Sequence, residues 1–182
     1  NIEIIKFIIP LAFVGVLIGT FTFSYLTNDH IRILIGLMAI IFCLDYYFRK
    51  DSDKPKKPSK FASYFWPSLS GFTSFSIHAG GLPLSFYLLP MRLDRTMYVA
   101  TAGLFYLLIN LFKIFPYAYL GEMNFENIYT SLLLLPLAPL GVYFGAYLVD
   151  KIGQDWFYKI GYFCTLLAGC KLFYDGSIRL FL

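Results

Sequence analysis

Two adjacent glycines and a proline interrupt a strongly apolar stretch of the chain, and a histidine stands two residues before them. The paired glycines allow the backbone to turn tightly with positive φ, and Pro83 is placed where the first turn of a new helix begins. Free amide N–H groups at such a helix start favour an anion, because they are hydrogen-bond donors and the positive end of the helix dipole lies there. The pattern predicts an anion-binding turn formed by His78, Ala79, Gly80, Gly81, Leu82 and Pro83. The alternative is that the glycines only let two helices approach closely.

Polar side chains next to the glycines extend this candidate site. Ser74 and Ser76 can donate hydrogen bonds to an oxyanion, although serines in membrane helices often bond only to a local carbonyl group. His78 can bind a proton, a substrate or a backbone carbonyl, and the sequence leaves these alternatives open. The three cysteines form no C-x-x-C pair, and no cluster of metal-ligating residues is visible. We therefore expect no metal and no cofactor.

A second candidate group lies about 30 residues further along the chain, at Asn110 and Lys113. Their spacing places an amide and a positive charge on one face of a helix. An ionisable group inside a membrane points to a functional site by default. The alternative is that Lys113 extends to the membrane surface, since Pro116 follows three residues later. Their position on a segment next to the glycine pair favours including both residues in the predicted substrate site.

The composition determines which elements must carry these residues. Hydrophobic residues make up 58% of the chain and charged residues only 14%, with a mean hydropathy of +0.65. A soluble domain has about 45–50% apolar and 25% charged residues, so the sequence predicts an all-α integral membrane protein. Five stretches approach the roughly 20 apolar residues that a membrane helix needs. They are residues 4–26, 31–49, 95–115, 128–149 and 156–175.

The segment 62–90 differs from these five stretches because prolines and glycines interrupt it. It is long enough to cross the bilayer once, yet it can also enter and return, and the Lys and Arg positions do not decide between the two. The connection 50–61 before it is rich in lysine and proline, which predicts a solvated linker on the cytoplasmic side. Broken segments of this kind occur where backbone lines a polar cavity in a transporter.

An internal repeat organises the chain. Residues 10–19 and 136–145 are identical at six of ten positions, which predicts that the helix pair 1–49 corresponds to the pair at 128–175. Residues 62–182 then form a complete second repeat that begins with the broken helix 62–90. We expect the two repeats to be inverted, as in many transporters. The partner of 62–90 would lie roughly 60 residues before Asn1, so we expect an N-terminal part to be missing.

The run from Gly71 to Pro90, followed by Leu93-Asp94, Thr101, Asn110, Lys113, Pro116-Tyr117 and Gly121, resembles the second half of the TauE/SafE sulfite exporter family. The resemblance implies a bacterial inner-membrane permease in which each of two repeats contributes a glycine-rich broken segment. It also implies that Gly80, Gly81 and Pro83 shape the substrate loop. Asn110 and Lys113 match the family's Asn-x-x-Lys pattern. The first repeat's glycine motif is absent from this chain.

We therefore expect a secondary transporter, not an enzyme, that exports a small anion such as sulfite or an organosulfonate. The expected partners are this anionic organosulfur solute and the lipid bilayer, with no nucleic acid, and a homo-oligomer is left open. Two alternatives from other classes remain. An intramembrane enzyme would need a second group, such as Asp45, against His78. A structural or accessory subunit would use the same polar residues only to hold helices together.

Overall fold

The protein is an all-helical membrane protein. The computed structural model describes residues 1–22, 27–48, 54–121, 129, 131–132 and 134–181. Within these residues, three helices are long and apolar enough to cross a membrane, namely α1 (Ile2–Thr22), α2 (Asn28–Phe48) and α5 (Arg95–Tyr119). The others are α3 (Lys60–Ser76), α4 (Gly81–Leu88), the 3-10 helix η1 (Leu89–Met91), α7 (Leu137–Lys151) and α8 (Gln154–Phe181).

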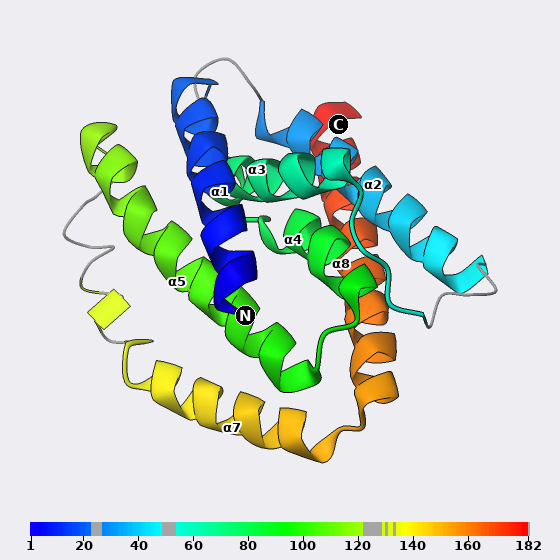
Figure 1. Ribbon diagram of the computed structural model, residues 1–182. Coiled ribbons are helices and arrows are strands. Elements are labelled where there is room, and N and C mark those ends of the chain that lie inside the picture. The colour runs from blue at the N-terminus through cyan, green and yellow to red at the C-terminus, as the bar shows by residue number, and fades with distance from the viewer. Residues whose placement is uncertain (23–26, 49–53, 122–128, 130, 133, 182) are drawn as a thin grey trace.

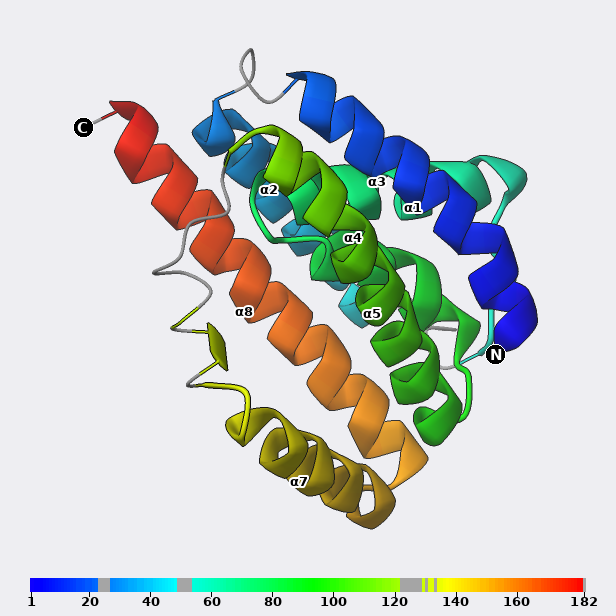
Figure 2. The same ribbon diagram turned by 90° about the vertical axis from the view of Figure 1, so that its left-hand side faces the viewer.

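The helices fall close to the predicted spans, with shifts at their ends. The spans 4–26, 31–49, 95–115 and 156–175 coincide with α1, α2, α5 and α8, while residues 23–26 and 49–53 lie outside the described part. In the span predicted at 128–149, the described residues 129, 131–132 and 134 are helical, a turn follows at residues 135–136, and α7 starts at Leu137, while residues 128, 130 and 133 are not described. No residue of α7 is buried, and this helix lies at the edge of the bundle in both views (Figures 1 and 2).

The broken segment is a helical hairpin that returns to the end where it starts. α3 enters the bundle, the turn at residues 77–80 reverses the chain, and α4 with η1 leads back (Figure 1). Trp66 of α3 packs against Phe86 of α4 with ring centroids 5.0 Å apart, and the Lys56 amide in the linker donates a hydrogen bond of 2.8 Å to the Pro90 carbonyl oxygen. α3 and α4 therefore run in opposite directions, which favours a segment that returns over one that crosses.

Glycines let the hairpin pack directly onto α1. A Cβ atom on Gly15 would overlap the Ser68 carbonyl oxygen, and one on Gly71 would overlap the Ala12 carbonyl oxygen. Only residues without side chains permit this approach of two backbones, as in other small-residue contacts between membrane helices. The hairpin is therefore held firmly against α1, with Phe75, Leu84 and Leu88 in the shared core.

α2 and α8 pack against each other in opposite directions. A Cβ atom on Gly36 would lie 2.7 Å from the Gly169 carbonyl oxygen, and the Cys43 thiol donates to the Tyr162 carbonyl oxygen at 3.4 Å. The assignment of 1–49 and 62–182 to two repeats stays a prediction.

Candidate functional site

The turn at residues 77–80 separates α3 from α4, as the glycine and proline pattern predicts. The positive φ is found at His78, with a value of 55°, whereas Gly80 has φ −59°. The expectation that the glycines adopt positive φ was therefore wrong. Gly80 is required for a different reason, because a Cβ atom there would lie 2.6 Å from both the Ser70 carbonyl oxygen and the Ser74 Cβ. Close approach of two helices explains this glycine.

The start of α4 retains free backbone donors. Within the described residues, neither the Gly80 nor the Gly81 N–H donates a hydrogen bond, and Pro83 has no N–H. The Gly80 carbonyl oxygen is occupied, since it accepts from the Ser70 hydroxyl at 2.7 Å and from the Leu84 amide at 3.2 Å. Unpaired amides at the positive end of a helix are suited to hold an anion.

A cavity of about 730 Å³ lies against this turn, with walls from α2, α4, α5 and α8. We call it the large cavity. Four of the predicted site residues line it, and Tyr106 from α5 faces them, with its hydroxyl 3.3 Å from where a Gly81 Cβ would be. The predicted residues that line the large cavity are His78, Ala79, Gly81 and Leu82. Those that do not are Ser74, Ser76, Gly80, Pro83, Asn110 and Lys113.

Charged residues lie along the wall of the large cavity that is formed by the C-terminal part of α8 and the start of α2. Lys171, Asp175 and Arg179 follow one another at four-residue intervals on α8, and Arg32 lies beside them. Arg32 is paired with Asp29 at 2.7 Å. The cavity lining thus carries three cationic side chains and one carboxylate, an excess of positive charge that attracts anions.

Lys113 lies outside the large cavity and is buried, with 5% of its surface exposed. Its Nζ donates to the carbonyl oxygen and to the hydroxyl of Ser74, each at 3.1 Å. The Tyr117 hydroxyl, one turn further along α5, donates to the Phe75 carbonyl oxygen at 3.0 Å. The carbonyl oxygens of the last turn of a helix have no partners within it. α5 therefore supplies two donors that stabilise the C-terminal end of α3.

Asn110 does not join this arrangement. Although it is three residues from Lys113, its side chain is exposed, and it makes no hydrogen bond with the hairpin among the described contacts. The sequence also predicts that Arg92, Asp94 and Arg95, which follow the broken segment, pair or cap in a short loop at the membrane surface. Asp94 does cap α5, because its carboxylate accepts from the amides of Thr96 and Met97 at 2.9 and 3.4 Å.

Several cavity residues were not predicted from the sequence. Tyr98, Tyr106 and Thr165 belong to apolar helices in which aromatic and small polar residues are common, so nothing distinguishes them. The charged residues could have been found, because Lys171, Asp175 and Arg179 repeat every four residues on one face of a predicted membrane helix. Charges in such a row indicate a polar cavity or an interface between helices.

Comparison with known protein families agrees with this architecture. The model of the family described as "Sulfite exporter TauE/SafE" matches residues 1–172. The chain therefore belongs to the TauE/SafE family of membrane transporters. No curated protein and no solved structure matched the chain.

Proposed function

We propose that this TauE/SafE chain moves a small anion, such as sulfite or an organosulfonate, through the large cavity. The observation that carries the proposal is the broken hairpin, whose turn brings Gly81 and the start of α4 to the cavity. The unpaired amides there provide donors for an oxyanion. The cationic residues at the α8 wall favour a negatively charged solute over a cation.

The substrate site that we propose has an inner and an outer part. His78, Ala79, Gly81 and Leu82 contact the solute directly, because they line the large cavity. Gly80 and Pro83 shape the turn, and Lys113 with Ser74 holds the end of α3 in place. Among the contacts of the described residues, none supports a role for Asn110 in binding.

We further propose that the protein is an exporter in the bacterial inner membrane and that the linker faces the cytoplasm. The described part of the linker carries Lys54, Lys56 and Lys57, and the returning hairpin brings Arg92 and Arg95 to the same end of the bundle. Cytoplasmic loops of membrane proteins are enriched in such residues. Cleavage of the linker by an added protease in inside-out vesicles, but not in right-side-out vesicles, would support this orientation.

Flux measurements on reconstituted protein test the proposed function. Liposomes containing the protein should take up radiolabelled sulfite or organosulfonate faster than protein-free liposomes. Gly81→Val should slow this flux strongly, since a Cβ there meets the Tyr106 hydroxyl and larger atoms fill the cavity next to the turn. Gly103→Val is the matched control, because a Cβ on Gly103 has no neighbour within 4 Å. Equal flux in both variants would reject the proposed site.

The two alternative functions receive less support. Asp45, the carboxylate considered as a partner for His78 in an intramembrane enzyme, lines a different cavity together with Lys54 and Lys56. An accessory subunit would have helices packed closely around the whole turn. Gly80 is packed in this way, but Gly81 borders the large cavity, and this difference favours a carrier.

A further inference from the structure

A second cavity lies at the linker end of the bundle. This small cavity has a volume of about 120 Å³, and Tyr46, Lys54, Lys56, Pro90 and Tyr162 are among the residues that line it. Gly161 lines the large cavity, whereas Tyr162, the next residue along α8, lines the small one. The two cavities therefore border consecutive residues of α8, next to a layer of buried side chains to which Tyr162 belongs.

This aromatic layer consists of Cys43, Tyr46, Leu89, Tyr158 and Tyr162, which form one buried cluster. Tyr46 from α2 and Tyr162 from α8 stack with ring centroids 3.5 Å apart and an angle of 6° between their planes. Leu89, at the end of the hairpin, fits against Gly161, where a Cβ would lie 3.1 Å from a Leu89 methyl group. Helices α2 and α8 and the hairpin all contribute residues to this layer, so it stays closed only while these elements stay together.

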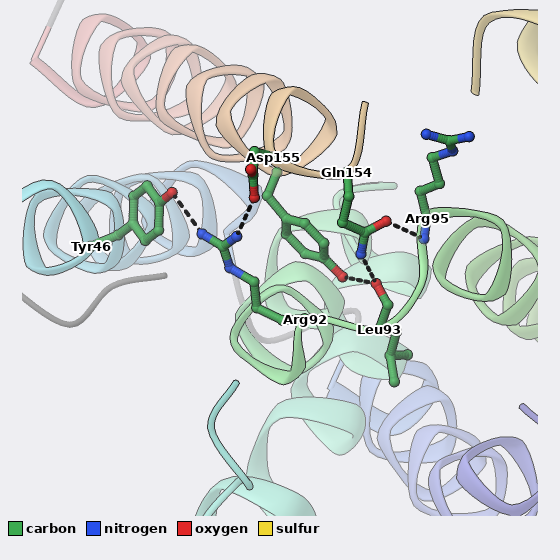
Figure 3. A network of polar contacts seen from close by, with 7 residues as sticks. Tyr46, Arg92, Leu93, Arg95, Gln154 and Asp155 are labelled. Carbon is green, nitrogen blue, oxygen red and sulfur yellow. Dashed lines mark hydrogen bonds and ion pairs between the residues drawn. The ribbon is translucent and has the colours of Figure 1, made fainter. Parts of the chain in front are cut away.

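Arg92 joins the same three elements through its side chain. Its guanidinium donates to the Tyr46 hydroxyl at 3.2 Å, contacts the Asp155 carboxylate at 3.5 Å and lies 4.9 Å from the centre of the Tyr158 ring. Figure 3 shows Arg92 between Tyr46 of α2 and Asp155 of α8. The residue has φ 50°, a left-handed conformation that is uncommon without glycine, and its side chain is 8% exposed.

The first turn of α8 also holds the backbone next to Arg92. The Leu93 carbonyl oxygen accepts from the Tyr158 hydroxyl at 2.6 Å and from the Gln154 side chain at 2.7 Å (Figure 3). Gln154 in turn accepts from the Arg95 amide at 3.0 Å. Contacts with α8 thus hold the backbone next to Arg92, while Tyr46 and Asp155 hold its guanidinium.

We propose that the two cavities are the two ends of one solute path and that Arg92 keeps the path closed at the linker side. This inference rests on the proposed transport function, and it assigns the small cavity, whose wall carries Lys54, Lys56 and the carboxylate of Asp45, as the second entrance for the anion. For the solute to pass, α2 or α8 must move away from the hairpin, which breaks the contacts of Arg92 with Tyr46 and Asp155. Polar contacts that form in only one of two arrangements bias the equilibrium between them.

Accessibility of Cys164 tests this proposal without requiring transport. Cys164 is exposed and lines the large cavity, and replacing Cys43 and Cys170 by serine leaves it as the single thiol. A membrane-impermeant maleimide is added to sealed vesicles of either orientation. We expect Cys164 to react from the side opposite the linker in the otherwise unchanged chain. In Arg92→Met, its reaction from the linker side should become faster by about tenfold, the effect of about 1.4 kcal/mol of lost stabilisation.

Arg95→Met is the matched control, because the Arg95 side chain contacts the carbonyl oxygens of Asp150 and Ile152 and, among the contacts of the described residues, makes none with the aromatic layer. It should leave the reaction from the linker side unchanged. If Arg92→Met does not fold, Tyr46→Phe is used in its place, because it removes one hydrogen bond to Arg92. We then expect a smaller increase in the rate at which Cys164 reacts from the linker side. The proposal is overturned if Cys164 already reacts equally from both sides, or if neither Arg92→Met nor Tyr46→Phe changes the rate. Because labelling needs no flux, these results are independent of whether sulfite is carried.

Discussion

Replacing Lys113 by methionine should loosen the turn at residues 77–80 without removing a group from the large cavity. Methionine fills a similar volume but cannot donate the two hydrogen bonds of 3.1 Å to the Ser74 carbonyl oxygen and hydroxyl. Lys113 lies outside the cavity lining, so its loss should act through the shape of the hairpin. The variant therefore separates a role in positioning the turn from a role in contacting the solute.

The size of the effect follows from these contacts. A hydrogen bond from a charged donor contributes about 1.5–3 kcal/mol, and an unsatisfied carbonyl group inside a membrane costs several kcal/mol. The ammonium group of Lys113 also loses its hydration when it is buried, and this penalty disappears in the variant. Taken together, these contributions lower the free energy of opening the turn by about 2 kcal/mol in the variant. This corresponds to about a 30-fold shift in the opening equilibrium. Tyr117→Phe, which removes one neutral donor to the Phe75 carbonyl oxygen, should cost about 1 kcal/mol.

Hydrogen exchange measured by mass spectrometry on the reconstituted protein gives the opening of the turn directly. Peptides covering residues 77–84 should exchange about 30-fold faster in Lys113→Met than in the unchanged protein, and anion flux should fall at the same time. Lys171→Met serves as the comparison, because Lys171 lines the cavity and makes no hydrogen bond with the turn among the described contacts. Unchanged exchange combined with abolished flux in Lys113→Met would refute the positioning role and indicate direct contact with the solute.

Three further predictions concern residues at the turn and the cavity wall. Gly80→Ala should destabilise the protein by about 1–3 kcal/mol in thermal unfolding, because its Cβ would lie 2.6 Å from the Ser70 carbonyl oxygen; a loss no greater than that of Gly103→Ala would contradict this reasoning. His78→Gly should stabilise by up to about 1 kcal/mol in the same measurement, since glycine adopts φ 55° without strain, and a clear loss of stability would argue against it. Asp175→Asn should lower the KM for anion flux by removing the single carboxylate of the cavity wall, with a smaller effect at high salt; an increase in KM would contradict the electrostatic argument.

The position of the break, but not its internal geometry, was predictable from the sequence. Two glycines and Pro83 interrupt an apolar stretch, and such residues end helices for local reasons. The reversal of the chain was not predictable, because it depends on contacts such as Lys56 with Pro90, which lie far apart in the sequence. The positive φ at His78 is likewise set by how α3 and α4 meet and not by the residue type.

The candidate site shows the same division between local and long-range information. Lys113 was expected to be functional because a buried charge needs a partner, and the structure places it inside the bundle. That its partner is the end of α3 and not the cavity depends on how α5 packs, which residue spacing does not determine. Asn110, only three residues away, lies on the exposed side of the same helix. For Arg92, the sequence indicated a surface loop, because its buried partners Tyr46 and Tyr158 come from two distant helices.

The most direct test of the account compares two thiol reagents of similar size and opposite charge at a single position in the turn. In a Gly81→Cys variant with the three native cysteines replaced, we would measure the reaction rates of 2-sulfonatoethyl and 2-trimethylammonioethyl methanethiosulfonate. Each rate is divided by the rate of the same reagent with a free thiol in solution. The account predicts that the anionic reagent, itself an organosulfonate, is favoured at residue 81. A preference for the cationic reagent, or no reaction with either one, would contradict an anion path at this turn.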